Sequence, residues 1–166
     1  MTSLLIFFVT LAASPAWCAD VFPHTEAENV SGKKVALPDD AKGHATVLVL
    51  GFTHTSQNQT KVWAAQLQPS VEMYSIAVLE DVPRLVRGMA VGGIKSSVPQ
   101  NQRDHYLLVF HGEKELKSAA GFEKPDDAYV VLLDRDGGIS WRFHGPFSES
   151  VCDDVKSRMS ALDAAK

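Results

Sequence analysis

The residue types most able to do chemistry lie together, directly after a continuous apolar run at Val47–Leu50. The segment from Thr53 to Thr60 carries one imidazole, four hydroxyls and three amides, and it contains no cysteine. An imidazole can accept a proton or ligate an ion, and hydroxyls at a helix N-terminus can hold an anion or a small polar ligand. The candidate binding residues in this segment are His54, Ser56, Gln57 and Thr60.

The elements around this segment would place it at one end of a sheet. An apolar run with no polar residue on either face predicts a strand that is covered on both sides, as in a parallel sheet of an α/β domain. Ser56 is predicted to be the N-cap of the following helix, with Gln59 as its capping-box partner. Val62, Trp63 and Leu67 predict a core-facing stripe on that helix. The candidate residues should therefore lie at the carboxyl end of a central strand, where α/β folds carry their sites.

The rest of the chain predicts an α/β fold built as a three-layer sandwich, with a central mixed β-sheet flanked by helices and an N-terminal β-hairpin. The hairpin turns at Ser31-Gly32, and a second hairpin turns at an Asp-Gly pair before a strand of alternating polarity. The last helix should begin near Ser148 or Ser150. The other predicted elements are strands at Val71–Leu79, His105–His111 and Tyr129–Leu133 and a helix at Glu113–Ala120, with a loop from Ile94 to Arg103.

A helix after Asp81 suggests a surface for a partner. Asp81 is its predicted N-cap, Gly92-Gly93 should end it, and Leu85, Val86 and Met89 should line one side. Arg84, Arg87 and Lys95 bracket the small residues Gly88, Ala90, Gly92 and Gly93, and small residues allow another helix to approach closely. Two interpretations are open for Arg84 and Arg87: a docking face for a protein, including a membrane protein, or an amphipathic helix on the sheet with its charges in water.

Residues 1–19 are predicted to be a signal peptide, because an apolar segment is followed by Pro15 and small residues. Cleavage is predicted after Ala16 or after Ala19, and the single domain at residues 20–166 would then lie in the periplasm or outside the cell. An uncleaved anchor and lipidation at Cys18 are the alternatives. If Cys18 leaves with the signal peptide, Cys152 is the one remaining cysteine, and no internal disulfide could form. Its position on the apolar stripe of the last helix predicts a small core residue, and the alternative is a thiol that pairs with another protein.

Several classes of function lack support in the sequence. The net charge is −4 and no basic run carries interleaved aromatics, which argues against nucleic acid. No cofactor motif is visible, and the Asp134–Gly137 turn has too few oxygen ligands for calcium. We expect a monomer or a weak dimer. The six histidines lack metal-site spacing and stand at His24, His44, His54, His105, His111 and His144.

Two stretches resemble thioredoxin-like proteins of the peroxiredoxin and cytochrome-maturation type. One runs from Gly32 through Leu37-Pro38 to the strand VLVLGF, and the other is YVVLLDRDGGISWRFHGPFS, similar to the closing hairpin of that superfamily. Three segments make the chain most similar to the mitochondrial ATP synthase assembly factor known as ATPase complex subunit ten and its bacterial relatives. They are YSIAVL at 74–79, RGMAVGGI at 87–94 and AGFEKPDDAYVVLLDRDGGISWRFHGP at 120–146.

The chain departs from the redox members of that superfamily at their reactive positions. Counted from Phe52, the places of the Cys-x-x-Cys motif hold Gln57-Asn58-Gln59-Thr60, and Asp127-Ala128 stand where a cis-proline would precede the strand at Tyr129. A thiolate is the nucleophile in thiol exchange, and amides and hydroxyls cannot replace it. The resemblance therefore implies a non-catalytic protein that binds a partner as an assembly factor. The alternatives are a small-ligand or enzymatic cleft around His54 and a thiol-dependent role for Cys152.

Overall fold

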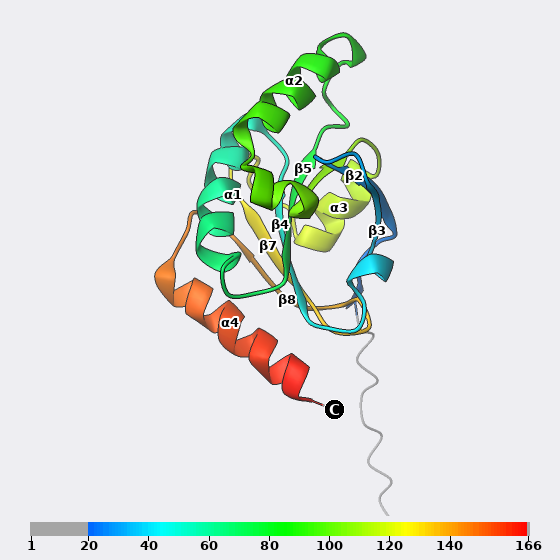
Figure 1. The fold of residues 1–166 in the computed structure, drawn as a ribbon. Coiled ribbons are helices and arrows are strands. Elements are labelled where there is room, and N and C mark those ends of the chain that lie inside the picture. Colours follow the sequence, from blue (N-terminus) through cyan, green and yellow to red (C-terminus); the bar gives the residue numbers. More distant parts are fainter. Residues whose placement is uncertain (1–19, 166) are drawn as a thin grey trace, which may run out of the picture.

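The computed structural model describes residues 20–165, so the predicted signal peptide lies outside the described residues. In the described chain eight strands form one mixed sheet, in the order β1-β8-β7-β4-β5-β6-β2-β3 (Figure 1). β4, β5 and β6 run parallel to one another, and the remaining neighbours pair antiparallel. The strands are β1 (Asp20–Val21), β2 (Thr25–Asn29), β3 (Lys34–Leu37), β4 (Thr46–Gly51), β5 (Met73–Val78), β6 (Tyr106–Val109), β7 (Tyr129–Leu133) and β8 (Gly138–His144).

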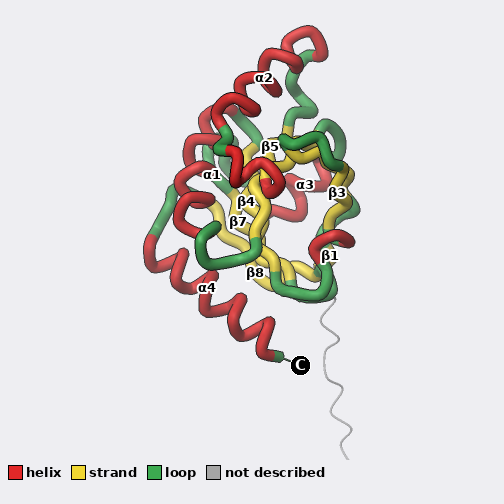
Figure 2. Tube along the Cα trace, viewed as in Figure 1, coloured by secondary structure: helices red, strands yellow, loops and turns green. Residues whose placement is uncertain are grey.

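The helices cover both faces of this sheet, which confirms the predicted three-layer α/β architecture (Figure 2). α1 and α4 pack on one face, and α2 meets the same face over β5 and β6. α3 and the β2–β3 hairpin close the other face. The bounds are α1 (His54–Leu67), α2 (Arg84–Ser97), α3 (Glu113–Ala120) and α4 (Glu149–Ala164), with short 3₁₀ turns at Asp39–Ala41 and Gln100–His105.

β4 is the central strand, as its apolar run predicts. Val47 and Val49 pack under α1 and α4, whereas Leu48 and Leu50 face α3 and the hairpin, and all four are fully buried. Burying these side chains stabilises the fold by roughly 1.5–3 kcal/mol for each residue. The strand ends at Gly51, and α1 begins three residues later.

The start of α1 differs from the prediction by one turn. The N-cap is Thr53, whose side chain accepts a hydrogen bond from the backbone N–H of Ser56, and Ser56 is the N3 residue that completes the capping box. Serine can serve at either place because its hydroxyl both donates and accepts. The predicted stripe is also partly wrong: Trp63 and Leu67 are buried, but Val62 is 47% exposed.

α2 departs furthest from its predicted boundaries. Pro83 takes the N-cap position in place of Asp81, and the helix continues past Gly92-Gly93 to Ser97. A helix-ending glycine adopts positive φ, and neither of these glycines does so. Leu85 and Met89 point away from the core, with exposed fractions of 97% and 72%.

The closing hairpin contains a β-bulge that changes which side chains share a face. Leu132 pairs with Trp141, but the next residue, Leu133, pairs with Ile139, so Ser140 is the extra residue. Ile139 therefore packs on the α3 face, whereas Trp141 packs on the α4 face. The predicted strict alternation of this strand is wrong because a bulge inserts one residue into the pleat. β8 is not the outermost strand along its whole length, because β1 pairs with it at Gly138 and Ile139.

Candidate functional site

The carboxyl end of β4 and the first turns of α1 form a tightly packed corner. A Cβ atom added to Gly51 would lie 3.1 Å from Ser56 Oγ and 3.1 Å from Thr60 Cγ2, so the helix rests directly on the strand end. Gln57 approaches the same point, with its Cγ 3.5 Å from that position. The predicted residues Ser56, Gln57 and Thr60 thus stand at the tip of the innermost strand.

Two of these hydroxyl groups are engaged within the corner. Ser56 Oγ donates to the carbonyl of Thr53 at 2.9 Å and accepts from its N–H at 3.0 Å. Thr60 Oγ1 donates to the carbonyl of Gln57 at 2.9 Å. Both side chains are buried, whereas His54 is exposed at the first residue of α1. The structure therefore groups Ser56, Gln57 and Thr60 around Gly51 and turns His54 toward solvent.

A loop from the other half of the chain closes over this corner. Thr53 Oγ1 lies 3.1 Å from the carbonyl oxygen of Pro125 and 3.3 Å from Asp126 Oδ1. Gln59 Oε1 accepts a hydrogen bond from the N–H of Ala128 at 3.1 Å. Thr53 and Gln59 are thus the residues that join α1 to the loop, and no local sequence pattern predicts this role for either residue.

Tyr129, the first residue of β7, also holds this loop through hydrogen bonds. Its buried hydroxyl accepts from the N–H groups of Glu123 and Lys124 at 3.0 and 2.8 Å and donates to the carbonyl of Lys124 at 2.8 Å. The ring stacks on Phe122 with centroids 5.5 Å apart, and Phe52 meets both rings edge-on. One tyrosine therefore fixes three backbone groups of the loop.

His144 on β8 adds a second anchor for the loop. Its Nδ1 lies 2.8 Å from Asp127 Oδ2, its Nε2 lies 3.4 Å from Glu123 Oε2, and its ring stacks on Tyr129. These residues are separated in the sequence and carry no motif, so only the pairing of β7 with β8 brings them together. Ala128 directly precedes β7, and the cis peptide bond found in the described chain is at Leu37-Pro38.

This corner can hold its own loop but presents no thiol. Thr53 and Gln59 form hydrogen bonds to the loop, whereas the hydroxyls of Ser56 and Thr60 bond backbone carbonyls at the start of α1. Cys152 lies on α4 and is buried at 3% exposure, which confirms the prediction of a core residue. In residues 20–165 no group of three or more His, Cys, Asp or Glu side chains is arranged to hold a metal ion.

The two arginines of α2 have different environments. Arg84 is exposed at the first helical residue. Arg87 is half-buried, and its Nη2 donates to the carbonyls of Glu80 and Val82 at 3.3 and 3.2 Å. Its guanidinium also lies 5.2 Å from the ring centroid of Phe110. Arg87 therefore ties the helix to the preceding loop, and Arg84 remains available to an outside partner.

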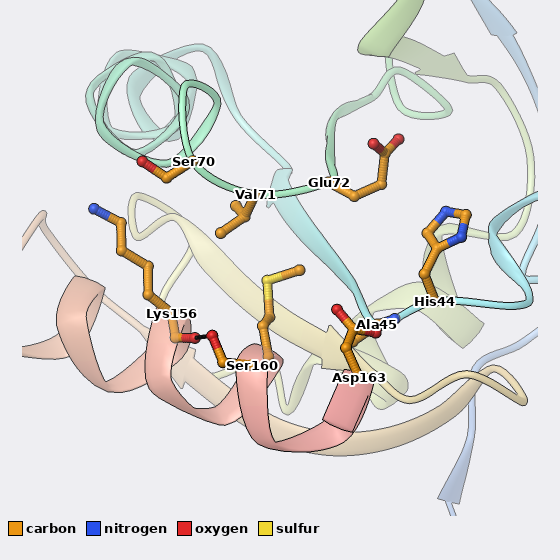
Figure 3. A pocket seen from close by; sticks show the side chains of 9 residues that line it. His44, Ala45, Ser70, Val71, Glu72, Lys156, Ser160 and Asp163 are labelled. Atoms are coloured by element: carbon orange, nitrogen blue, oxygen red, sulfur yellow. Dashed lines mark hydrogen bonds between the residues drawn. The ribbon is translucent and has the colours of Figure 1, made fainter. Parts of the chain in front are cut away.

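A separate cavity of about 390 Å³ lies at the opposite end of the sheet, before β4 and β5 (Figure 3). Lys156 and Ser160 of α4 stand on one side, and Glu72 and His44 stand on the other. Asp163 at its rim accepts a hydrogen bond from the N–H of Ala45 at 2.8 Å. This carboxylate thus anchors α4 to the start of β4.

Comparison with models of known protein families finds a match over most of the chain. The model of the ATP10 protein family matches residues 6–158. The chain belongs to the ATP10 protein family. This confirms the family that the sequence suggested and gives the chain an assembly-factor role. No curated protein matches the chain.

Solved structures similar to this ATP10 family member have the thioredoxin-like fold. BsSco, a member of the Sco family of cytochrome c oxidase assembly proteins, is 15% identical with a TM-score of 0.59, over 90% of this chain and 96% of its own. The pneumococcal lipoprotein thioredoxin Etrx1 of Streptococcus pneumoniae is 14% identical with a TM-score of 0.58, over 84% and 100%. A DsbE-type putative thiol:disulfide interchange protein of Chlorobium tepidum is 17% identical with a TM-score of 0.54, over 87% and 96%.

These likenesses establish the fold, and the start of α1 in this ATP10 family member carries Gln57-Asn58-Gln59-Thr60 with no cysteine. Among residues 20–165 no helix is long and apolar enough to cross a membrane.

Proposed function

We propose that this protein is an exported, non-enzymatic assembly factor that binds a protein partner during the assembly of an envelope or membrane complex. The observation that carries the proposal is the corner at the start of α1. There, Thr53 and Gln59 bond the loop at Pro125–Ala128, in the region where a redox thioredoxin would present a thiol. The chain keeps the fold, and residues near the position of the reactive thiol form structural hydrogen bonds instead.

Thiol exchange is a poor alternative for chemical reasons. The reaction needs a thiolate that can reach the disulfide of another protein. The described chain holds Cys152 alone, and this side chain lies on the buried face of α4, in the core cluster that includes Val155, Met159 and Trp63. A partner could not reach its sulfur without displacing the helix.

The partner-binding part of the proposal is supported by α2. Leu85 and Met89 are the two most exposed large apolar side chains of the described domain, whose core is buried in three clusters. Exposed apolar side chains that gather on one helix are typical of a protein interface. Arg84 beside them would add a charge contact. Export is supported by the apolar segment and small residues of residues 1–19.

Two measurements test this function. First, the purified protein should not accelerate insulin reduction by dithiothreitol, and a clear acceleration would contradict the non-enzymatic role. Second, the tagged full chain should recover one defined membrane complex or its subunits from native envelope fractions. The control is His54→Ala, which alters the exposed residue of the corner and should recover the same complex. Recovery of the chain alone, or a cytoplasmic location on fractionation, would contradict the proposal.

A further inference from the structure

One face of α2 is directed entirely away from the domain. Its outward residues follow helical spacing, at positions i, i+3, i+4, i+7 and i+11, and form a continuous stripe. Ile94 on the opposite side is buried among Leu79, Val98 and Leu108, which fixes the direction of the helix. The outward stripe is made of Leu85, Gly88, Met89, Gly92 and Ser96, all of which are exposed.

The glycines of α2, two of which lie on this stripe, have no explanation inside the described chain. A Cβ atom added to Gly88, Gly92 or Gly93 would meet no atom within 4 Å. None of the three has positive φ, so no turn requires them either. Glycine is the poorest helix former after proline. The lack of side chains at these glycines therefore matters only to a molecule that approaches the helix from outside the domain.

The charge on α2 lies on one flank of the stripe. Arg84 and Lys95 fall on the side of Gly88, at spacings of four and seven residues from it. Neither forms a salt bridge in residues 20–165, and the helix contains no acidic residue. The two cations are about 16 Å apart along the axis, at 1.5 Å for each residue. The whole chain carries a net charge of −4, so this flank is a local positive strip.

We propose that the stripe binds one apolar helix of the protein partner, in a close crossing over Gly88 and Gly92, with a carboxylate of that helix facing Arg84 or Lys95. This proposal rests on the assembly role proposed above and specifies the partner surface. Small residues four apart let two helix backbones approach, as in packed membrane helices. Leu85 and Met89 then fill the grooves on either side of the crossing.

The same features disfavour two other occupants. A lipid surface takes up an amphipathic helix through large apolar side chains and clustered cations, and it gains nothing from glycines. A second copy would bring another α2 with three cations and no acid, so its flank offers no counter-charge. A partner helix with small residues could pack closely against the glycines, and an acidic flank on that helix could pair with Arg84 and Lys95.

The probe is a pair of fluorescent helical peptides of about 20 apolar residues in dodecylmaltoside micelles. Both carry glycines at four-residue spacing, and one has two flanking glutamates where the other has two lysines. Binding to the full chain is measured by anisotropy. We expect the glutamate peptide to bind at least about tenfold more tightly than the lysine peptide, which corresponds to 1.4 kcal/mol.

Variants separate the steric part from the charged part. Gly88→Leu with Gly92→Leu should weaken binding at least about tenfold while the melting temperature is kept, because the added side chains enter open space. Arg84→Glu with Lys95→Glu should reverse the preference toward the lysine peptide. The matched controls are Ala161→Leu on α4 and Lys114→Glu on α3, which are also exposed and should bind as the unaltered chain does.

Several results would overturn this inference. They are equal binding of the two peptides, unchanged binding by the leucine variant, sedimentation of the chain with peptide-free phosphatidylglycerol vesicles, and concentration-dependent dimers that the leucine variant abolishes. If the leucine variant still recovers the complex from native envelopes, the assembly role stands and the docking surface lies elsewhere. If the unaltered chain recovers no complex, the proposed function itself fails.

Discussion

The side-chain oxygen of Gln59 accepts a hydrogen bond from the backbone N–H of Ala128 at 3.1 Å, which joins α1 to the residue that precedes β7. Ala128 is fully buried, so its N–H has no water to bond if the glutamine is lost. In this position the amide completes the corner that a redox thioredoxin would use for chemistry.

Gln59→Met should therefore destabilise the domain. The substitution keeps the length of the side chain but leaves the buried N–H of Ala128 unpaired, which costs about 1–3 kcal/mol. Gln59→Glu keeps a hydrogen-bond acceptor and should lose less stability than Gln59→Met. Urea unfolding followed by circular dichroism measures both, with the exposed neighbour change Asn58→Gln as the control. A midpoint for Gln59→Met equal to that of the unaltered chain would show that the bond is not formed.

Gly51→Ala tests how closely α1 rests on β4. The new methyl group would meet Ser56 Oγ and Thr60 Cγ2 at 3.1 Å, and overpacking of this kind costs about 1–3 kcal/mol. Adding Thr60→Ser removes one of these contacts. The free energy of unfolding should therefore fall less in the double variant than the sum of the decreases in the two single variants. Gly88→Ala serves as the control, because its methyl group enters open space and should not lower the free energy of unfolding. Strict additivity in the unfolding free energies would contradict the predicted contact.

The Cys152 thiol should be protected in the native protein. Its side chain is 3% exposed beneath α4, so dithionitrobenzoate should react slowly in buffer and completely in guanidinium chloride. A Cys18→Ser background isolates this thiol. Cys152→Ala should leave partner recovery unchanged. Rapid native labelling, or loss of the partner in the alanine variant, would favour a thiol-dependent role instead.

Tyr106 should make the fold sensitive to high pH. Burial raises the pKa of this phenol from 10.0 to about 12. Because the folded pKa lies above the unfolded one, the contribution to stability is complete below pH 10 and is lost progressively as the pH rises toward 12. A shift of this size corresponds to about 2–3 kcal/mol.

Unfolding midpoints measured between pH 9 and 12 check this contribution. Tyr106→Phe should remove most of the alkaline decline, whereas a residual slope remains from Tyr74, whose pKa is also raised, chiefly by burial and then by the charge of Glu72. An identical pH profile for the unaltered chain and Tyr106→Phe would refute the assignment.

The sequence by itself determined the layers of this protein. The apolar run at Val47–Leu50 predicts a strand covered on both faces, and the Asp-Gly turn and the stripe of α4 required no distant contact to be recognised. The family followed from local segments as well. The absence of cysteine from the segment Thr53 to Thr60 was also readable from the sequence alone.

Only the tertiary structure decided which residues meet. Tyr129, His144 and the loop at Glu123–Asp127 come together because β7 pairs with β8, and such pairing is a long-range interaction without a local pattern. The sequence left the orientation of α2 open for the same reason. A helical stripe of Leu85 and Met89 indicates that one face is apolar, but whether that face meets the core or a partner depends on where Ile94 finds a buried place on the sheet.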